Sequence, residues 1–318
     1  RHGQRAPRTE NAEKQGERQV TAEAGGHRRV GYTRRSNHTM QARRPFLILA
    51  LLVLLGATVR LRDVGEDALT SDEAFSWRIV QYPVGEMLQR AAADVHPPLY
   101  YVLLEPWLAL LGDTPLALRG LSILLGLLAL PAVFFMTREV FLTFAPEAVA
   151  RQRGDPTFLA GLLAAALVAL HPTLVFASQN ARMYSLSTLL AALSTGLLAR
   201  ALRTGRGYEL YGIATAAAWY GHYYAFFTTL TQGLLALALE TPRRRAELGR
   251  SGPRPLLGLV RAALMALVLY APWLPVLWAQ TRRVGANYWI PRLSLPSVTE
   301  ALLGGNLVLV QVAVPMRW

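Results

Sequence analysis

The sequence predicts an all-α protein that crosses a membrane several times, and three observations predict it. Apolar runs long enough to span a bilayer, roughly 20 mostly apolar residues each, recur along the chain. Only 17% of the 318 residues are charged, whereas a typical soluble domain has about 25%. The arginines behind the net charge of +13 lie in the N-terminal tail and in short loops between apolar runs. That distribution is typical of a membrane topology signal, so we expect the lipid bilayer, and no nucleic acid, as a partner.

The two ends of the chain differ from its apolar middle. Residues 1–44 are predicted to be a disordered basic tail, because they hold eleven Lys and Arg, four Glu and few large apolar side chains. Residues 1–39 are alternatively upstream sequence, with Met40 as the start. No small-residue cleavage site follows the first apolar run, so no cleavable signal peptide is expected. The chain ends inside a semi-apolar stretch, and we expect residues 280–318 to be an extracytoplasmic segment that leads into a missing C-terminal part.

Seven apolar segments are predicted to span the membrane and to form a core over residues 45–279. They are residues 45–61, 117–137, 157–177, 183–202, 208–221, 223–239 and 256–279. The fifth and sixth segments are short, so a single long tilted helix over both is an alternative to a hairpin of two spans.

The apolar segment 97–111 is predicted not to cross. It is short and holds a Glu-Pro pair near its middle, and its aromatic residues, Tyr100 and Tyr101 among them, fit an interfacial belt. Two arginines before the first span place the N-terminus in the cytoplasm. If 97–111 does not cross, eleven arginines of the later loops also face the cytoplasm. Residues 62–116 then form a long first extracytoplasmic loop that carries juxtamembrane helices.

With the topology fixed by basic residues alone, the unusual polar segments gather on the outer side. They lie at residues 71–73, 94–98, 178–184, 222–224 and 288–291. The chain has no cysteine, which excludes disulfides, zinc–thiolate sites and thiol nucleophiles. This pattern favours an extracytoplasmic active site built from carboxylates, imidazoles and arginine.

Asp72 and Glu73 are candidate catalytic carboxylates. Two adjacent carboxylates at a membrane surface repel each other and lose solvation, so one pKa should rise. A partly buried carboxylate suits the general base that deprotonates an acceptor hydroxyl. The alternative is a helix N-cap at residues 71–73, and capping does not exclude catalysis.

Asp94 and His96 precede two prolines, which fix the chain before a helix begins. Asp94 is a third catalytic candidate. Together with Glu73, these residues offer oxygen and nitrogen ligands for a divalent cation, Mg²⁺, Mn²⁺ or Zn²⁺. The alternative is that the prolines simply mark the start of a helix and that His96 is an interfacial residue. A metal ion is therefore a possible cofactor, and the only one considered.

Arg182 and Tyr184 follow a polar break at the outer edge of a span. An arginine there can snorkel toward the surface, but it is also the side chain best suited to hold a phosphate by two hydrogen bonds. Both residues are therefore candidates to bind a donor phosphate. His222 and Trp289 are further candidates to support a sugar, an acceptor or a metal, although such residues are more often interfacial.

Four stretches, in this order and spacing, resemble the GT-C glycosyltransferases, specifically the glycosyltransferase family 39-like group. That group includes protein O-mannosyltransferases and lipid A aminoarabinose transferases. The stretches are SDEAF at 71–75, DVHPPLYY at 94–101, LGDTPLALR at 111–119 and QNARMYSL at 179–186. The resemblance implies a GT-C-type core of about seven transmembrane helices, in agreement with the predicted spans.

The resemblance also implies an activity. The donor would be a polyprenyl-phosphate-linked sugar, and the acceptor a glycolipid, a lipopolysaccharide or other polysaccharide, or a protein. Transfer would invert the sugar, on the extracytoplasmic face of the bacterial cytoplasmic membrane. Asp72 would be the base, Arg182 would hold the donor phosphate, and Glu73, Asp94 and His96 would support the acceptor or a metal.

A transporter or flippase of a lipid-linked substrate is the alternative function. Transporters place ionisable residues near the bilayer centre, whereas the centres of the predicted spans are uncharged here. An intramembrane hydrolase would need Ser/His or His-Glu-x-x-His motifs, which the sequence lacks.

Overall fold

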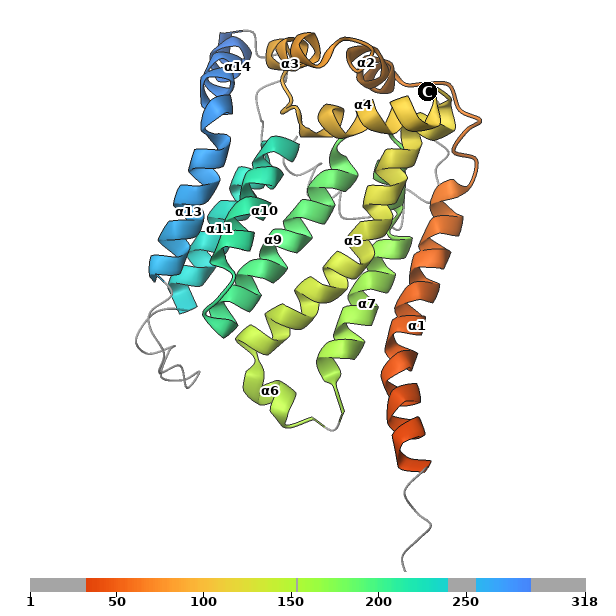
Figure 1. Cartoon of the computed structure of the whole chain (residues 1–318), viewed down its shortest axis with the longest axis vertical. Coiled ribbons are helices and arrows are strands. Elements are labelled where there is room, and N and C mark those ends of the chain that lie inside the picture. The colour runs from red at the N-terminus through yellow and green to blue at the C-terminus, as the bar shows by residue number, and fades with distance from the viewer. Residues whose placement is uncertain (1–32, 153, 240–255, 287–318) are drawn as a thin grey trace, which may run out of the picture. The chain divides into compact units, whose positions relative to one another are not determined.

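The computed structural model describes residues 33–152, 154–239 and 256–286, and every regular element in those ranges is a helix. The chain divides into two units, Arg1–Leu47 and Ile48–Trp318, and all contacts discussed below belong to the second. The helices are α1 Thr33–Leu61, α2 Ser71–Ile79, α3 Val84–Ala93, α4 Leu99–Leu111, α5 Pro115–Phe144, α6 Pro146–Ala150, α7 Pro156–Leu170, α8 Pro172–Ser178, α9 Tyr184–Thr204, α10 Tyr208–Gly221, α11 Ala225–Leu239, α13 Leu256–Tyr270, a 3₁₀ turn at Ala271–Trp273, and α14 Leu274–Ala286 (Figure 1).

The described helices confirm a helical membrane protein but do not support seven spans. Three stretches are long and apolar enough to cross a bilayer: α5, α9 and the stretch Leu256–Gly285, and the bent pair α7–α8 is a fourth if it counts as one span. The apolar part of α1, Phe46–Leu61, is a shorter helix, and so is α11. α10 has only 14 residues, or about 21 Å at 1.5 Å per residue, against a hydrocarbon core of about 30 Å.

Helix α4 lies across the ends of the long helices and contacts α5 and α10 (Figure 1). Its 13 residues begin after Pro98 and end before Gly112, whose φ of 84° is a conformation that favours glycine. At about 20 Å it is too short to cross a bilayer. Figure 1 shows α2 and α3 on the same end of the bundle, so the loop between α1 and α5 forms a helical cap there.

Helix α5 is the centre of the bundle, with α9 on one side and α7 on the other (Figure 1). Close approach of α5 and α9 depends on Gly196, because a Cβ there would lie 3.0 Å from the Cα of Met136. α10 and α13 approach similarly at Gly212, where a Cβ would lie 2.7 Å from the carbonyl oxygen of Ala262. Small residues at helix contacts let apolar helices pack closely in a membrane.

The predicted span 157–177 is broken into α7 and α8, which meet at 63°. Pro172 begins α8 and lacks the N–H that would bond the carbonyl of Val168 in a continuous helix. Arg60, buried on α1, donates to that carbonyl at 3.1 Å and to the carbonyl of Ala169 at 2.8 Å. Its Nε donates to the hydroxyl of Ser178 at 3.1 Å. One arginine thus satisfies two of the carbonyls that the break leaves open.

Candidate functional site

Polar side chains from five segments meet under the helical cap, at one end of the bundle. The segments are the start of α2, the α3–α4 connection, the first turn of α4, the turn that leads into the start of α9, and the turn between α10 and α11. The members of this cluster, which we call the rim cluster, are Asp72, Asp94, His96, Tyr101, Arg182, Tyr184 and His222. Six of these seven were candidates from the sequence.

Arg182 is the centre of the rim cluster. Its side chain is only 5% exposed, yet its hydrogen bonds are long. The guanidinium lies 3.5 Å from the hydroxyl of Tyr101 and 3.4 Å from each ring nitrogen of His96. Its buried Nε has no hydrogen-bond partner, and the nearest charged oxygen, on Asp72, is 3.8 Å away. A buried guanidinium is usually fully bonded, so Arg182 has unused donor capacity.

Asp94 and His96 form a pair that faces Arg182. The Asp94 carboxylate and Nδ1 of His96 are hydrogen-bonded at 3.0 Å, and both ring nitrogens of His96 lie 3.4 Å from the guanidinium of Arg182. Burial by itself would raise the pKa of Asp94. The hydrogen bond and charge of His96 and the charge of Arg182 outweigh it and hold that pKa below its ordinary value. Asp94 therefore carries a negative charge beside the guanidinium.

Asp72 and Glu73 are neighbours in opposite surroundings. The side chain of Asp72 is 63% exposed, and its carboxylate lies 3.8 Å from Arg182. The cap of α2 is Thr70, whose hydroxyl accepts from the N–H of Glu73 while the Glu73 carboxylate accepts from the N–H of Thr70. The alternative role as a cap thus falls on Thr70 and Glu73, and Asp72 remains open to an incoming molecule.

Glu73 is fully buried in an ion pair with Arg119 of α5. The two guanidinium–carboxylate bonds measure 2.8 and 3.0 Å, and the N–H of Ala181 donates to the same carboxylate at 3.1 Å. Burial by itself would raise the pKa of Glu73, but its bonds from Arg119, Thr70 and Ala181 hold the pKa below its ordinary value. Because Glu73 is adjacent to Asp72 and Ala181 to Arg182, this carboxylate fixes both in place. Its geometry favours positioning over direct contact with a substrate.

His222 and Tyr184 form the far side of the rim cluster. The ring of His222 lies 6.2 Å from that of His96 and 6.3 Å from that of Tyr184, centroid to centroid. Its Nδ1 accepts from the N–H of Tyr224 at 3.1 Å. Burial, together with the charges of His96 and Arg182, lowers the pKa of His222 to about 4. His222 is therefore neutral at physiological pH, and Tyr184 is half-exposed beside it.

The predicted metal ligands do not fit a divalent cation. Within the described ranges, no group of three or more His, Asp or Glu side chains could hold a metal ion. Glu73 is bound to Arg119, and the guanidinium of Arg182 lies against His96 and would repel a second cation. Glu73, Asp94 and His96 therefore do not act as one ligand set in this structure.

Helix α14 holds the α3–α4 connection from outside. The buried amide of Gln280 donates to the carbonyls of Ala91 at 3.1 Å and Asp94 at 2.7 Å. Arg283 donates to the carbonyls of Ala92 and Ala93. The side-chain oxygen of Gln280 accepts from the hydroxyl of Tyr223. These bonds satisfy the open C-terminal carbonyls of α3 and set the position of Asp94.

Sequence reasoning missed several residues of the site. Tyr101 was expected at the membrane interface, but both it and Tyr100 are fully buried. Neither Arg119 nor Gln280 was assigned a role from the sequence, although a charged side chain inside an apolar segment, such as Arg119 in the predicted span 117–137, is a usable signal. Trp289 lies outside the described residues, so its predicted role stays a prediction.

The rim cluster combines an exposed carboxylate, a buried guanidinium with spare donors, and a neutral imidazole at the edge of an apolar bundle. Such a set can bind an anionic group at Arg182 while Asp72 accepts a proton from a second molecule. Comparison of the chain with protein-family models, with curated proteins and with solved structures finds no match.

Proposed function

We propose that this chain is a membrane glycosyltransferase that moves a sugar from a polyprenyl-phosphate donor to an acceptor hydroxyl. One observation carries the proposal: the buried guanidinium of Arg182, with an unpartnered Nε, lies 3.8 Å from the exposed carboxylate of Asp72. A phosphate leaving group needs a cationic donor as charge develops on it. An acceptor hydroxyl needs a base within reach.

The proposed reaction is a single displacement at the anomeric carbon. Asp72 takes the proton of the acceptor hydroxyl, whose oxygen attacks the anomeric carbon on the face opposite the phosphate. The bond between that carbon and the phosphate oxygen breaks, and polyprenyl phosphate leaves with the electron pair. Arg182 stabilises the charge on the departing phosphate, and one displacement inverts the sugar.

The other members of the rim cluster have supporting roles in this proposal. Asp94 orients His96 and balances the charge of Arg182. Burial raises the pKa of Tyr101, so its hydroxyl stays neutral and can donate to a phosphate oxygen. Glu73 holds the base and the arginine through its bonds to Arg119 and Ala181.

The four stretches that resemble the GT-C glycosyltransferases support the same proposal, because three of them contribute residues to the rim cluster and the fourth contributes Arg119. With them we propose a GT-C-type core of about seven helices in the bacterial cytoplasmic membrane. The rim cluster would face the extracytoplasmic side, where a glycolipid, a polysaccharide or a protein serves as acceptor.

A transporter fits the described residues less well. The central turns of the long described helices carry no Asp, Glu, Lys, Arg or His, and the ionisable groups lie toward the helix ends. A transporter places its substrate-binding polar groups near the bilayer midplane. Charges at one end of the bundle favour chemistry on a lipid headgroup.

The test incubates membranes that contain the full chain with labelled polyprenyl-phosphate sugars, among them mannose, glucose and aminoarabinose. Mass spectrometry then identifies labelled lipid, polysaccharide or protein. Transfer from at least one donor, absent from membranes without the chain, is the expected result. Movement of an intact donor across the membrane without any transferred sugar would contradict the proposal and support the transporter.

A further inference from the structure

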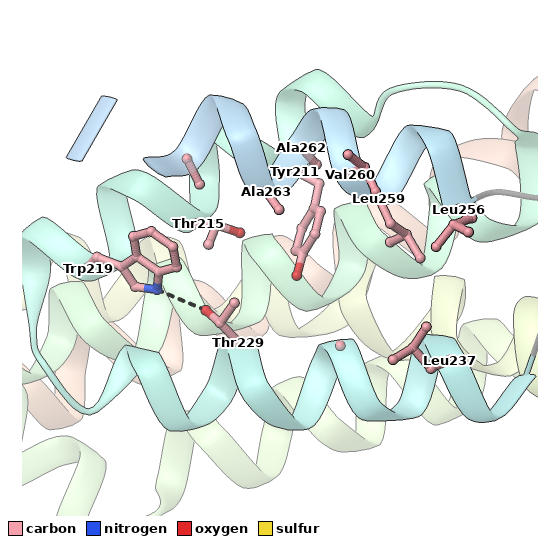
Figure 2. A pocket seen from close by; sticks show the side chains of 12 residues that line it. Tyr211, Thr215, Trp219, Thr229, Leu237, Leu256, Leu259, Val260, Ala262 and Ala263 are labelled. Atoms are coloured by element: carbon pink, nitrogen blue, oxygen red, sulfur yellow. Dashed lines mark hydrogen bonds between the residues drawn. The ribbon is translucent and has the colours of Figure 1, made fainter. Parts of the chain in front are cut away.

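An apolar cavity of about 270 Å³ lies between α10, α11 and α13, away from the rim cluster (Figure 2). Its lining residues share one property, the absence of any charged side chain. They are Tyr211, Thr215, Trp219, Thr229, Gly233, Leu237, Leu256, Leu259, Val260, Ala262, Ala263 and Ala266. A cavity of this lining suits a long apolar group better than a polar solute.

Small side chains leave this space open. Ala262, Ala263 and Ala266 present one short wall on α13, and Gly233 faces the cavity from α11. A Cβ added at Gly233 would meet no atom within 4 Å, so that position is empty rather than tightly packed. Interiors are normally close-packed, which makes an empty apolar space of this size a candidate binding site.

The cavity is accessible from the apolar surface of the bundle. Leu237 and Leu256, at the end opposite Trp219 (Figure 2), are about half-exposed, as is Val260. In a bilayer these side chains contact lipid tails, so an apolar chain can enter sideways without crossing water.

Residues that adjoin the other end of the cavity connect it to the rim cluster. Trp219 ends the cavity and donates to the hydroxyl of Thr229 at 3.0 Å, the bond drawn in Figure 2. One turn further on, the N–H of His222 bonds the carbonyl of Ala218 at 2.9 Å. The His222 ring lies 6.2 Å from that of His96. His96 in turn lies 3.4 Å from the guanidinium of Arg182.

We infer that this cavity holds part of the isoprenoid chain of the lipid that the rim cluster binds by its phosphate. The inference rests on the proposed function. An uncharged apolar cavity on helices that lead to a buried cation complements a molecule with one anionic head and one long apolar tail. Binding the tail in the cavity while the phosphate is held at Arg182 positions the reacting carbon, because the phosphate cannot then slide along the bundle. A membrane phospholipid is the competing occupant.

The test uses polyprenyl phosphate that bears a photoreactive diazirine in its chain and no sugar. The purified full chain is irradiated with this probe in detergent, and labelled peptides are identified by mass spectrometry. We expect label on α10, α11 or α13, displaced by unlabelled polyprenyl phosphate but not by phosphatidylglycerol. Label confined to other helices, or displacement by phosphatidylglycerol at equal concentration, would overturn the inference.

Two filling variants make the test specific. Gly233→Leu fills the cavity from α11, and Ala263→Leu fills it from α13. One variant that folds normally is sufficient for the test. Gly85→Leu is the matched control, because Gly85 lies exposed on α3 and a Cβ there also meets nothing within 4 Å. We expect labelling to fall at least tenfold in a filling variant and to be unchanged in the control. Equal labelling of parent and filling variants would overturn the inference.

The probe carries no sugar, so the two proposals can fail separately. Sugar transfer without label in the cavity would overturn only the cavity's role. Label in the cavity without transfer from any donor would overturn only the glycosyltransferase, and would leave a site for polyprenyl phosphate itself.

Discussion

Asp72 and Glu73 differ in environment because successive residues of a helix point about 100° apart. At the start of α2 this rotation turns Glu73 toward Arg119 in the interior and leaves Asp72 facing outward. A carboxylate bound by several donors is a weak base, since those bonds stabilise its charged form. Of the two, the structure therefore favours Asp72 as the proton acceptor.

Asp72→Asn is expected to lower sugar transfer by roughly 100-fold or more, the typical contribution of a general base. Asparagine keeps the shape of the side chain but cannot take a proton. Asp113→Asn, another exposed carboxylate at the same end of the bundle, is the matched control and should retain full activity. The measurement is the rate of sugar transfer in membranes that contain equal amounts of each variant. Near-parent activity of Asp72→Asn would show that Asp72 is not the base.

Arg182→Lys is expected to weaken use of the lipid donor by on the order of 10- to 150-fold. A lysine can snorkel as well as arginine but cannot form two parallel bonds to a phosphate, a loss worth about 1.5–3 kcal/mol. Loss of transition-state stabilisation would appear in kcat, and loss of donor docking mainly in KM. Parent-like values of both constants would show that Arg182 does not hold the donor phosphate.

His222 is expected to make the folded state sensitive to acid. Its pKa is about 4 in the folded protein against 6.5 ordinarily, because burial, His96 and Arg182 all oppose its protonation. The unfolded chain therefore takes up a proton first as pH falls below about 6.5, and stability declines from there toward pH 4.

Thermal unfolding in detergent at pH 7.5, 6 and 5 measures this sensitivity. His222→Gln should flatten the fall in Tm between pH 7.5 and 5 relative to the parent, whereas His171→Gln, at the exposed end of α7, should not. The same slope in all three proteins would assign the acid sensitivity to other groups.

Most members of the rim cluster could be proposed from the sequence because the positive-inside rule assigns each loop to one side of the membrane without any knowledge of packing. Asp72, Asp94, Arg182 and His222 belong to loops that this rule places on one side. Tyr101 could not be assigned, since whether an aromatic side chain at a helix start faces lipid or the interior depends on which helix covers it.

At the level of elements, the α7–α8 break shows where an apolar pattern is insufficient. Hydropathy is continuous through residues 157–177, and the sequence therefore predicts one span. Pro172 ends the helix locally, but a proline can also merely kink a membrane helix. The bend of 63° is stable because Arg60, more than 100 residues away in sequence, bonds the open carbonyls.

Arg60→Met is expected to destabilise the protein by about 1–3 kcal/mol, because the buried carbonyl of Ala169 and the part-buried carbonyl of Val168 lose their donor. Arg62→Met is the matched control, since the Arg62 side chain is 82% exposed and its loss should change stability by about 0.5 kcal/mol or less. Thermal unfolding in detergent compares the two. An equal effect of both substitutions would contradict the proposed role of Arg60.

For the whole molecule, the number of spans is what the sequence predicted least well. The sequence shows only how many apolar residues a segment has, whereas a helix that crosses the bilayer must be about 30 Å long. The helices α10 and α11 are shorter than that. Whether short helices cross with a thinned bilayer depends on lipid and on neighbouring helices, which composition does not encode.

Single cysteines at Asp113 and Arg203 test the topology directly, because the chain has no other thiol. Asp113 lies between α4 and α5, and Arg203 lies in the last turn of α9. A membrane-impermeant thiol reagent on intact cells should label the cysteine at 113 and reach that at 203 only after lysis. Labelling at 113 only from the cytoplasmic side would overturn both the topology and the extracytoplasmic site.

The bonds from α14 to the end of α3 also have a consequence for biosynthesis. Gln280 holds the carbonyl of Asp94, which the ribosome makes 186 residues earlier. At roughly 5–20 residues per second, that interval lasts on the order of 10 to 40 s. Throughout it the α3–α4 connection lacks its final restraints and its carbonyls must bond water. The nascent protein therefore cannot hold Asp94 and His96 in their final places until almost all of the described chain has been inserted.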